Sequence, residues 1–211
     1  MIKNYFYSDR FYKNLIKKKK DPRIIKEYKK LLKYKKMIKF VYQNVPKGTG
    51  DAVLKTKRFI TDKYFLMLLP DDLIIKKNCS KSMINVHQKY KSSVMASMHV
   101  NKSTVSRWGI YNLSKRLSKS DYLISDVVEK PSIKDAPSNK AVIGRYILPK
   151  TIFKKLKNQN PGNGGEIHIT DAIQSLIKDN EKFIAHNFSG KYLDCGTMNG
   201  YINSGKKISN L

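Results

Sequence analysis

An apolar run from Tyr64 to Leu69 ends in Pro70, Asp71 and Asp72. Such a run is typical of a strand covered on both faces, and proline ends it because proline cannot donate to a strand ladder. We expect this strand to be parallel to its neighbours, which would place two carboxylates at the sheet edge where α/β proteins bind ligands. One or two carboxylates of this kind suit a hard cation that also meets a phosphate substrate. An ordinary acidic turn after a strand is the alternative.

A glycine-containing loop, Pro46 to Asp51, precedes a predicted helix over residues 52–60. Glycines allow the backbone to approach a ligand closely, and the N-terminus of a helix favours anions. The loop therefore fits a phosphate or nucleotide contact. A simple turn before a helix fits it too.

A carboxylate and an ammonium group, Glu129 and Lys130, stand before Pro131 at the end of another predicted strand. A carboxylate can accept two sugar hydroxyls, and a lysine can neutralise a phosphate as a compact charge. The alternative is a surface ion pair, which contributes little to stability.

A third acidic position, Asp194, ends the predicted strand 191–194 and is followed by Cys195 and Gly196. If Asp194 and Asp71 converge, their oxygens make a site for a divalent ion. Taken alone, Asp194 also fits the cap of the final helix.

Nucleophilic catalysis finds no support in the sequence. The four histidines show neither metal-ligand spacing nor a carboxylate at the spacing of a catalytic triad. The serines near position 103 do not form a Gly-x-Ser-x-Gly elbow.

Strand and helix patterns alternate along the chain, which is typical of an α/β fold with a largely parallel sheet. Residues 1–36 are rich in lysine and tyrosine, and we expect two basic amphipathic helices there, the second starting at Asp21-Pro22. Residues 37–43 are predicted to form a strand. The expected organisation is a basic helical segment, 1–36, followed by one domain, 37–211.

The chain of 211 residues has a formal net charge of +27, from 43 lysines and arginines against 16 acidic residues. Such a charge is typical of proteins that meet nucleic acid, acidic membrane surfaces or anionic substrates. Only six residues are arginine, the side chain on which base recognition depends, and lysine enrichment also follows from an AT-rich coding sequence. Nucleic acid is therefore not the favoured partner, although a Lys-rich nucleic-acid-binding protein stays as the alternative function.

Two cysteines, Cys79 and Cys195, form neither a disulfide framework nor a metal-ligand spacing, which favours a reducing compartment. No apolar run approaches the length of a membrane span, and the N-terminal residues lack the apolar core of a signal peptide. We expect a cytoplasmic protein without membrane contact.

The motifs become specific through their order along the chain. They are PKGTGDAVL, LLPDD, VSRWGIY, VVEKPS, APSNKAVIGRYIL, PGNGGEIHITDAI and YLDCGTMNGYINS. In this order they resemble the bacterial UTP–glucose-1-phosphate uridylyltransferases, also called UDP-glucose pyrophosphorylases. The resemblance runs from about residue 38 to the end and is weaker over the basic helices. It implies a mixed, mostly parallel Rossmann-like nucleotidyltransferase sheet with flanking helices and Mg²⁺ as cofactor.

The resemblance also implies roles for single residues. Near the uracil and ribose it places Gln43, Gly48 and Gly50. For glucose 1-phosphate it implies Gly109, Glu129 and Lys130, with Glu129 on sugar hydroxyls and Lys130 on the phosphate. Asp71 would bind Mg²⁺ together with the α-phosphate, and Asp194 would be the second metal-side carboxylate. Asp71 and Lys130 would thus be the catalytic residues of a transfer from UTP to glucose 1-phosphate, which forms UDP-glucose and pyrophosphate.

One family segment has no counterpart in these residues. Members of the family open with an interior first strand and a loop of the form G-x-G-T-R-x-x-P, which cradles the triphosphate. We therefore expect a sheet that lacks the first strand and the phosphate loop, and a chain that acts as a fragment. Its partners would then be UTP and glucose 1-phosphate, with a homo-oligomer or a complementing N-terminal chain as further partners.

Overall fold

The structure is a computed structural model that describes residues 2–7 and 10–210. The chain divides into two compact units, Met1–Tyr42 and Gln43–Leu211, and each is described by itself. Within the described residues, no helix is both long and apolar enough to span a membrane.

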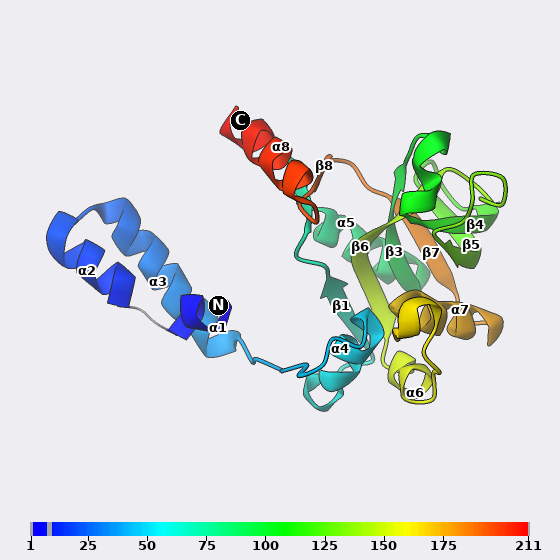
Figure 1. The fold of residues 1–211 in the computed structure, drawn as a ribbon, viewed down its shortest axis with the longest axis horizontal. Coiled ribbons are helices and arrows are strands. Elements are labelled where there is room, and N and C mark those ends of the chain that lie inside the picture. Colours follow the sequence, from blue (N-terminus) through cyan, green and yellow to red (C-terminus); the bar gives the residue numbers. More distant parts are fainter. Residues whose placement is uncertain (1, 8–9, 211) are drawn as a thin grey trace. The chain divides into compact units, whose positions relative to one another are not determined.

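The first unit contains three helices rather than the expected two (Figure 1). They are α1 (Ile2–Tyr7), α2 (Arg10–Lys19) and α3 (Pro22–Met37). The predicted start of α3 is confirmed: the Asp21 carboxylate accepts the Arg23 backbone N–H at 2.8 Å, and Pro22 occupies the first turn.

The predicted strand over residues 37–43 is wrong. Met37 is the last residue of α3, and the Ile38 N–H closes that helix by donating to the Tyr34 carbonyl at 3.0 Å. The following residues pair with no strand in the part of the chain that the structure describes. An apolar run can become a strand only where a partner strand lies beside it, and the sequence pattern does not report the partner.

The second unit is built of strands and helices, but they do not alternate regularly as predicted, because the strands between residues 109 and 149 follow one another with no α-helix between them. Its strands are β1 (Tyr64–Leu68), β2 (Asp72–Ile75), β3 (Ser93–His99), β4 (Gly109–Arg116), β5 (Asp121–Glu129), β6 (Lys140–Pro149), β7 (Phe183–Asn187) and β8 (Lys191–Asp194). Its α-helices are α4 (Thr49–Lys55), α5 (Cys79–Tyr90), α6 (Ile152–Lys157), α7 (Ile169–Lys178) and α8 (Met198–Ser209). Short 3₁₀ turns lie at Lys57–Phe59, Lys102–Arg107 and Asn163–Gly165.

The main sheet has the strand order β1-β6-β3-β7-β5-β4. Only the β3–β7 pair is parallel, so the expected mostly parallel sheet is wrong and the sheet is mixed and largely antiparallel. Apolar periodicity reports which face of a strand is buried, and it carries no information on strand direction. The sheet also curls, because Ile110 of β4 pairs with Ala141 of β6.

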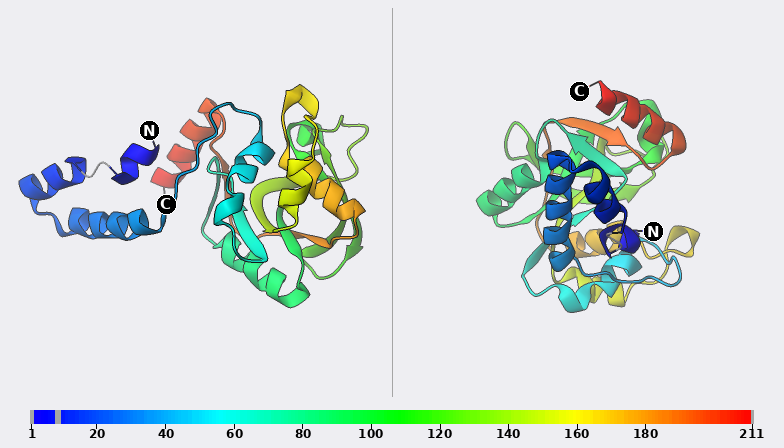
Figure 2. Two further views of the ribbon diagram at one scale, coloured as in Figure 1. Left: turned by 90° about the horizontal axis from the view of Figure 1, so that it is seen from below. Right: turned by 90° about the vertical axis from the view of Figure 1, so that its left-hand side faces the viewer.

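Helices cover both faces of this sheet. One core joins the sheet to α4, α6 and α7 through fully buried side chains such as Phe153, Ile173 and Tyr111. The other joins it to α5 through Met83 and Ile143. Figure 2 shows α5 and α7 on opposite sides of the sheet from two further directions. Strand β1 lies at the sheet edge and is only half-buried, so it is not the doubly covered strand that its apolar run predicted.

A buried guanidinium fixes the turn that follows β1. Arg145 of β6 donates to the carbonyls of Leu69 at 2.8 Å and Gly144 at 2.7 Å, and also to the carbonyl of Asp72. The Asp72 carboxylate in turn accepts the Gly144 N–H at 2.6 Å and the Tyr192 hydroxyl of β8. Asp72 therefore serves the fold, and Asp71 is the member of the pair whose side chain is left for a ligand.

We expect Arg145→Met to lower the free energy of unfolding by about 2 kcal/mol or more, because the Leu69 and Asp72 carbonyls lose a buried donor. Urea unfolding followed by the fluorescence of the single tryptophan measures this. Arg58→Met, at an exposed arginine, is the matched control and should stay within about 0.5 kcal/mol of the unsubstituted protein. Equal midpoints for the two variants would contradict the structural role of Arg145.

Candidate functional site

A cleft of about 570 Å³ opens in the second unit where β1 and β5 end. Among the residues that line it are Thr49, Leu69, Glu129, Lys130, Tyr146 and His168. The structure thus brings the predicted Glu129 and Lys130 to one hollow, next to the first turn of α4. Both side chains are exposed there.

Glu129 and Gly109 face one another on neighbouring strands. A Cβ atom on Gly109 would lie 3.1 Å from the Glu129 Oε2 and 3.1 Å from a Val142 methyl, so a larger residue here would press on the Glu129 carboxylate. The predicted grouping of Gly109, Glu129 and Lys130 is therefore present in the geometry.

Lys130 turns the chain out of β5. Its φ of 46° is a left-handed conformation that L-residues rarely adopt, and its N–H donates to the Trp108 carbonyl at 3.0 Å. Such conformations gather at functional sites. Among the residues that the structure describes, no ion pair joins Lys130 to Glu129, so the surface-pair alternative gains no support.

The glycine loop is held against the segment before α7. The Gly50 N–H donates to the Ile167 carbonyl at 2.8 Å, and the Ile167 N–H donates to the Lys47 carbonyl at 2.8 Å. A Cβ on Gly48, which has a φ of 96°, would lie 2.6 Å from the Ile167 oxygen. The two glycines are thus required by backbone packing, and this packing presents Thr49 to the cleft. Helix α4 begins at Thr49, earlier than the predicted residue 52.

Gln43 ties this loop together. Its side-chain amide donates to the Gly48 carbonyl at 3.1 Å and to the Asp51 Oδ2 at 2.7 Å. Asp51 is buried, yet the hydrogen bond from Gln43, aided by Lys55 at 3.3 Å, lowers the pKa of Asp51 below its ordinary value. Gln43 therefore stabilises the ionised form of a buried carboxylate beside the cleft.

Asp71 and Asp194 converge on Gly196. A Cβ on Gly196 would lie 2.9 Å from the Asp71 Oδ2 and 3.4 Å from the Asp194 Oδ1. The strands behind them are paired: Asp72 lies opposite Asp194 in the β2–β8 ribbon, and the Cys195 N–H donates to the Asp71 carbonyl at 2.8 Å. The sequence analysis made a divalent-ion site conditional on the convergence of Asp71 and Asp194, and in the structure the two side chains do converge.

Asp194 does not cap the final helix, so that alternative is wrong. Thr197 holds the cap position of α8, where its hydroxyl accepts the Gly200 N–H at 3.0 Å. The Asp194 Oδ1 accepts the Gly196 N–H at 2.9 Å, and its Oδ2 lies 3.7 Å from Arg107. No group of three or more His, Cys, Asp or Glu side chains is positioned for a metal in the described part of the chain.

Tyr146 is a site residue that the sequence reasoning missed. It lines the cleft, and burial first, then the charges of Asp72, Glu129 and Asp71, raise the pKa of its hydroxyl well above the ordinary value. The Tyr146 hydroxyl thus stays protonated and lies within electrostatic reach of both acidic groups. Tyr146 follows Arg145 directly in β6, so the hydrogen bonds by which Arg145 clamps the turn after β1 also position Tyr146.

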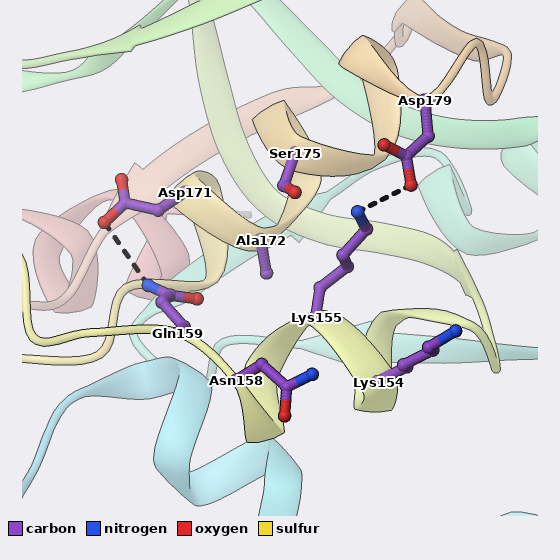
Figure 3. A pocket seen from close by; sticks show the side chains of 8 residues that line it. All are labelled: Lys154, Lys155, Asn158, Gln159, Asp171, Ala172, Ser175 and Asp179. Atoms are coloured by element: carbon purple, nitrogen blue, oxygen red, sulfur yellow. Dashed lines mark hydrogen bonds and ion pairs between the residues drawn. The ribbon is translucent and has the colours of Figure 1, made fainter.

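A second hollow of about 320 Å³ lies between α6 and α7 (Figure 3). Three of its four charged side chains have a partner: Lys155 lies 2.5 Å from Asp179, and the Gln159 amide donates to Asp171 at 3.3 Å. Gln159 also donates to the His168 carbonyl at 3.0 Å. None of the predicted site residues lines this hollow, and its contacts support the segment that carries His168 into the cleft.

The family of the chain follows from comparison with known proteins. A family model described as nucleotidyl transferase matches residues 3–210. The chain therefore belongs to the nucleotidyl transferase family, in agreement with a mixed sheet that carries a Lys–Glu pair and two converging aspartates.

Its relatives narrow the class further. A UTP–glucose-1-phosphate uridylyltransferase of Pseudomonas aeruginosa is 39% identical over 166 residues, which are 77% of this chain and 59% of that protein. UTP–glucose-1-phosphate uridylyltransferase 2 of Streptococcus pyogenes serotype M3 is 38% identical over 168 residues, 77% of this chain and 56% of its own length. A solved UDP-glucose pyrophosphorylase complexed with UDP-glucose has a TM-score of 0.80 and 36% identity, and the match covers 90% of this chain and 74% of that one. The chain thus spans less than two thirds of the length of these curated relatives.

The Asp51 contact makes stability depend on pH. The folded-state pKa of Asp51 lies below the unfolded value of about 3.9, so its contribution is present above that value and is lost as the pH falls through the folded-state pKa. We expect the difference in unfolding free energy between the protein and Asp51→Asn to be largest above about pH 5 and to shrink below about pH 4. Urea titrations at stepped pH measure it.

Gln43→Leu and Lys55→Met separate the two partners of Asp51. Because the Gln43 hydrogen bond is the larger cause of the lowered pKa, Gln43→Leu should reduce the pH-dependent difference more than Lys55→Met does. A larger effect of Lys55→Met would show that the ion pair, and not the amide, holds the carboxylate.

Proposed function

We propose that this site transfers a uridylyl group from UTP to glucose 1-phosphate, forming UDP-glucose and pyrophosphate. The observation that carries the proposal is the meeting of two pairs of charged groups, Glu129 with Lys130 in the cleft and Asp71 with Asp194 at Gly196. The names of the relatives supply the nucleotide and the sugar.

Glu129 and Lys130 are assigned to glucose 1-phosphate. The exposed Lys130 ammonium neutralises the phosphate, and the Glu129 carboxylate accepts sugar hydroxyls, with its position secured by the bare backbone of Gly109. Leu69 and Ile169 add apolar lining beside them.

Gln43, Gly48 and Gly50 are assigned to the uracil and ribose side. They shape the loop that presents Thr49 and the first turn of α4 to the cleft. This helix has only seven residues, so its contribution is the close approach of backbone and not a strong dipole.

Asp71 and Asp194 are assigned to Mg²⁺. The residues fit this ion: both are carboxylates, both lie close to Gly196, and Mg²⁺ with a phosphate substrate needs one or two carboxylates. When bound there, Mg²⁺ supplies charge neutralisation at the α-phosphate. Asp72 cannot share this role, since its two oxygens are engaged by Gly144 and Tyr192.

The chemistry that this arrangement supports is an in-line displacement. A phosphate oxygen of glucose 1-phosphate attacks the α-phosphorus of UTP. A P–O bond forms between these two atoms, and the bond from the α-phosphorus to the leaving pyrophosphate breaks. No protein nucleophile takes part, so the work of the residues is to bind, to orient and to neutralise charge. The Tyr146 side chain lines the cleft with Glu129 and Lys130, and its raised pKa keeps the hydroxyl protonated.

We further propose that full turnover needs a phosphate-binding segment in addition to the residues assigned above. None of the described residues is assigned to the β- and γ-phosphates of UTP. Such a segment of the same protein, a complementing chain or a second copy in a homo-oligomer would provide it. The residues 37–211, in this proposal, form the nucleotidyltransferase domain. The alternative of nucleic-acid binding gains no support from the relatives described above.

Binding of UDP-glucose tests the assignment of Lys130 without depending on turnover. We expect UDP-glucose with Mg²⁺ to raise the melting temperature, and Lys130→Met to weaken UDP-glucose binding by about tenfold or more, since a lost charge–phosphate contact costs at least about 1.4 kcal/mol. Thermal shift and titration calorimetry measure both quantities.

Lys134→Met is the matched control, because Lys134 is an exposed lysine four residues away that does not line the cleft. It should bind UDP-glucose as the unsubstituted protein does. Equal weakening by both variants would mean that the general positive charge, and not the cleft, holds the sugar nucleotide. Release of pyrophosphate from UTP and glucose 1-phosphate then tests the reaction itself.

The metal assignment predicts that the Mg²⁺-dependent part of this thermal shift disappears in Asp71→Asn, because one of the two anionic ligands is lost. The magnesium-independent part should persist. Asp62→Asn, at an exposed aspartate outside the site, should keep the full Mg²⁺ response. An unchanged Mg²⁺ response in Asp71→Asn would remove Asp71 from the metal site.

A further inference from the structure

A serine, a histidine and an aspartate form a chain of hydrogen bonds that the proposed uridylyl transfer does not use. The Ser82 Oγ lies 2.6 Å from the His186 Nε2, and the His186 Nδ1 lies 2.7 Å from the Asp121 Oδ1. The three residues come from α5, β7 and the start of β5. The sequence analysis found no support for nucleophilic catalysis, because these residues lie far apart in the chain and only the fold brings them together.

The direction of the proton in each contact follows from the chemistry of the groups. An ionised carboxylate can only accept, so the Nδ1 of His186 donates to Asp121. The Nε2 of the neutral ring is then an acceptor, and the Ser82 hydroxyl donates to it. This is the arrangement of a serine, a general base and an orienting carboxylate.

Asp121 is itself held in place. Its Oδ2 accepts the Ser118 hydroxyl at 2.7 Å, and its N–H donates to the same Ser118 oxygen at 3.1 Å. Asp121 and His186 stand directly opposite each other on neighbouring strands, and both are more than nine-tenths buried. The base and its carboxylate are therefore fixed before any reagent arrives.

Ser82 is half-buried, whereas its two partners are buried. The Ser82 hydroxyl does not cap the helix, because Asn78 holds the cap position of α5 and accepts the Lys81 N–H at 2.9 Å. The Ser82 N–H keeps its ordinary helical bond to the Asn78 carbonyl at 3.2 Å.

This group lies apart from the cleft. Asp121 begins β5 and Glu129 ends it, and nine residues of strand span roughly 26 Å at about 3.3 Å per residue. Substitutions at Ser82 therefore leave the UDP-glucose contacts untouched, and the inference does not depend on the proposed uridylyl transfer.

We propose that Ser82, His186 and Asp121 form a second reactive centre, in which Ser82 is the nucleophile toward small electrophilic acyl esters. The Ser82 oxygen bonds to the acyl carbon while the bond to the leaving alkoxide breaks, and the serine proton passes through the His186 Nε2 to the leaving oxygen. Water then attacks the acyl group with the same base, which releases the carboxylic acid and restores the serine.

Diisopropyl fluorophosphate is the probe for this centre, because ester reagents also acylate the many exposed lysines of this chain. In the labelling step the Ser82 oxygen bonds to phosphorus, fluoride leaves, and the proton passes through His186 to solvent. Intact-mass and peptide analysis should find one label on Ser82. General-base help contributes about 10²–10⁴-fold, so His186→Asn and Asp121→Asn should each slow labelling at least about tenfold.

Ser80→Ala is the matched control, since Ser80 lies on the same helix and is half-buried like Ser82. It should label at the unsubstituted rate, whereas Ser82→Ala should not label. Circular dichroism confirms that each variant is folded, and Ser82→Ala keeps the test decisive if a variant of a buried partner fails to fold. No label on Ser82, or labelling of Ser82 and Ser80 at equal rates, would overturn the proposal and leave the three side chains a purely structural link between α5 and the sheet.

Discussion

The buried guanidinium of Arg145 is the constraint on which the candidate site depends. Burial of a cation is costly unless its donors are satisfied, and here the donors meet backbone carbonyls on both sides of the β1 turn. These contacts set the path of the chain at Asp71. Since Tyr146 follows Arg145 in the same strand, they also position Tyr146, which lines the cleft. One arginine thus positions two parts of the site that the sequence separates widely.

Asp71 and Asp72 are adjacent residues of the same type, yet their different contacts give them different roles. The Asp72 carboxylate faces back to Gly144 and Tyr192, and its strand pairs with the strand of Asp194. Burial and the hydrogen bond to Asp72 raise the pKa of Tyr192, so this hydroxyl remains a donor across the physiological range. The structural carboxylate therefore joins the two acidic motifs and leaves Asp71 turned toward Asp194 at Gly196. The two carboxylates that we assign to Mg²⁺ are thus positioned by a third, Asp72, whose oxygens are engaged by Gly144 and Tyr192.

The sequence predicts those features that local chemistry determines. The Asp21–Pro22 helix start and the strands predicted over residues 64–69 and 191–194 follow from capping and apolar periodicity, and they are confirmed within a residue. Strand direction is not encoded in periodicity, so the mostly parallel sheet was wrong. The segment 37–43 has strand-forming residues without a partner strand, which propensity alone does not reveal. For the candidate site, the positions of Glu129 and Asp194 at strand ends followed from their motifs, whereas the hydrogen bonds of Asp72 and the place of Tyr146 in the cleft depend on contacts between strands far apart in the sequence.

Long-range pairing explains the reactive centre at Ser82 in the same way. Its members are separated by 104 and 65 positions along the chain, so no local spacing could indicate them. A buried histidine needs hydrogen-bond partners on both ring nitrogens. His186 lies on β7, which pairs with β3 and β5, and it finds Ser82 of α5 on one side and Asp121 of β5 on the other. The same need for satisfied buried groups produces the Arg145 clamp. In the clamp the three guanidinium contacts all go to backbone carbonyls, but at Ser82 the final donor is a side-chain hydroxyl. Because of that difference, the Arg145 network only stabilises the fold, whereas the Ser82 network includes a hydroxyl that can react.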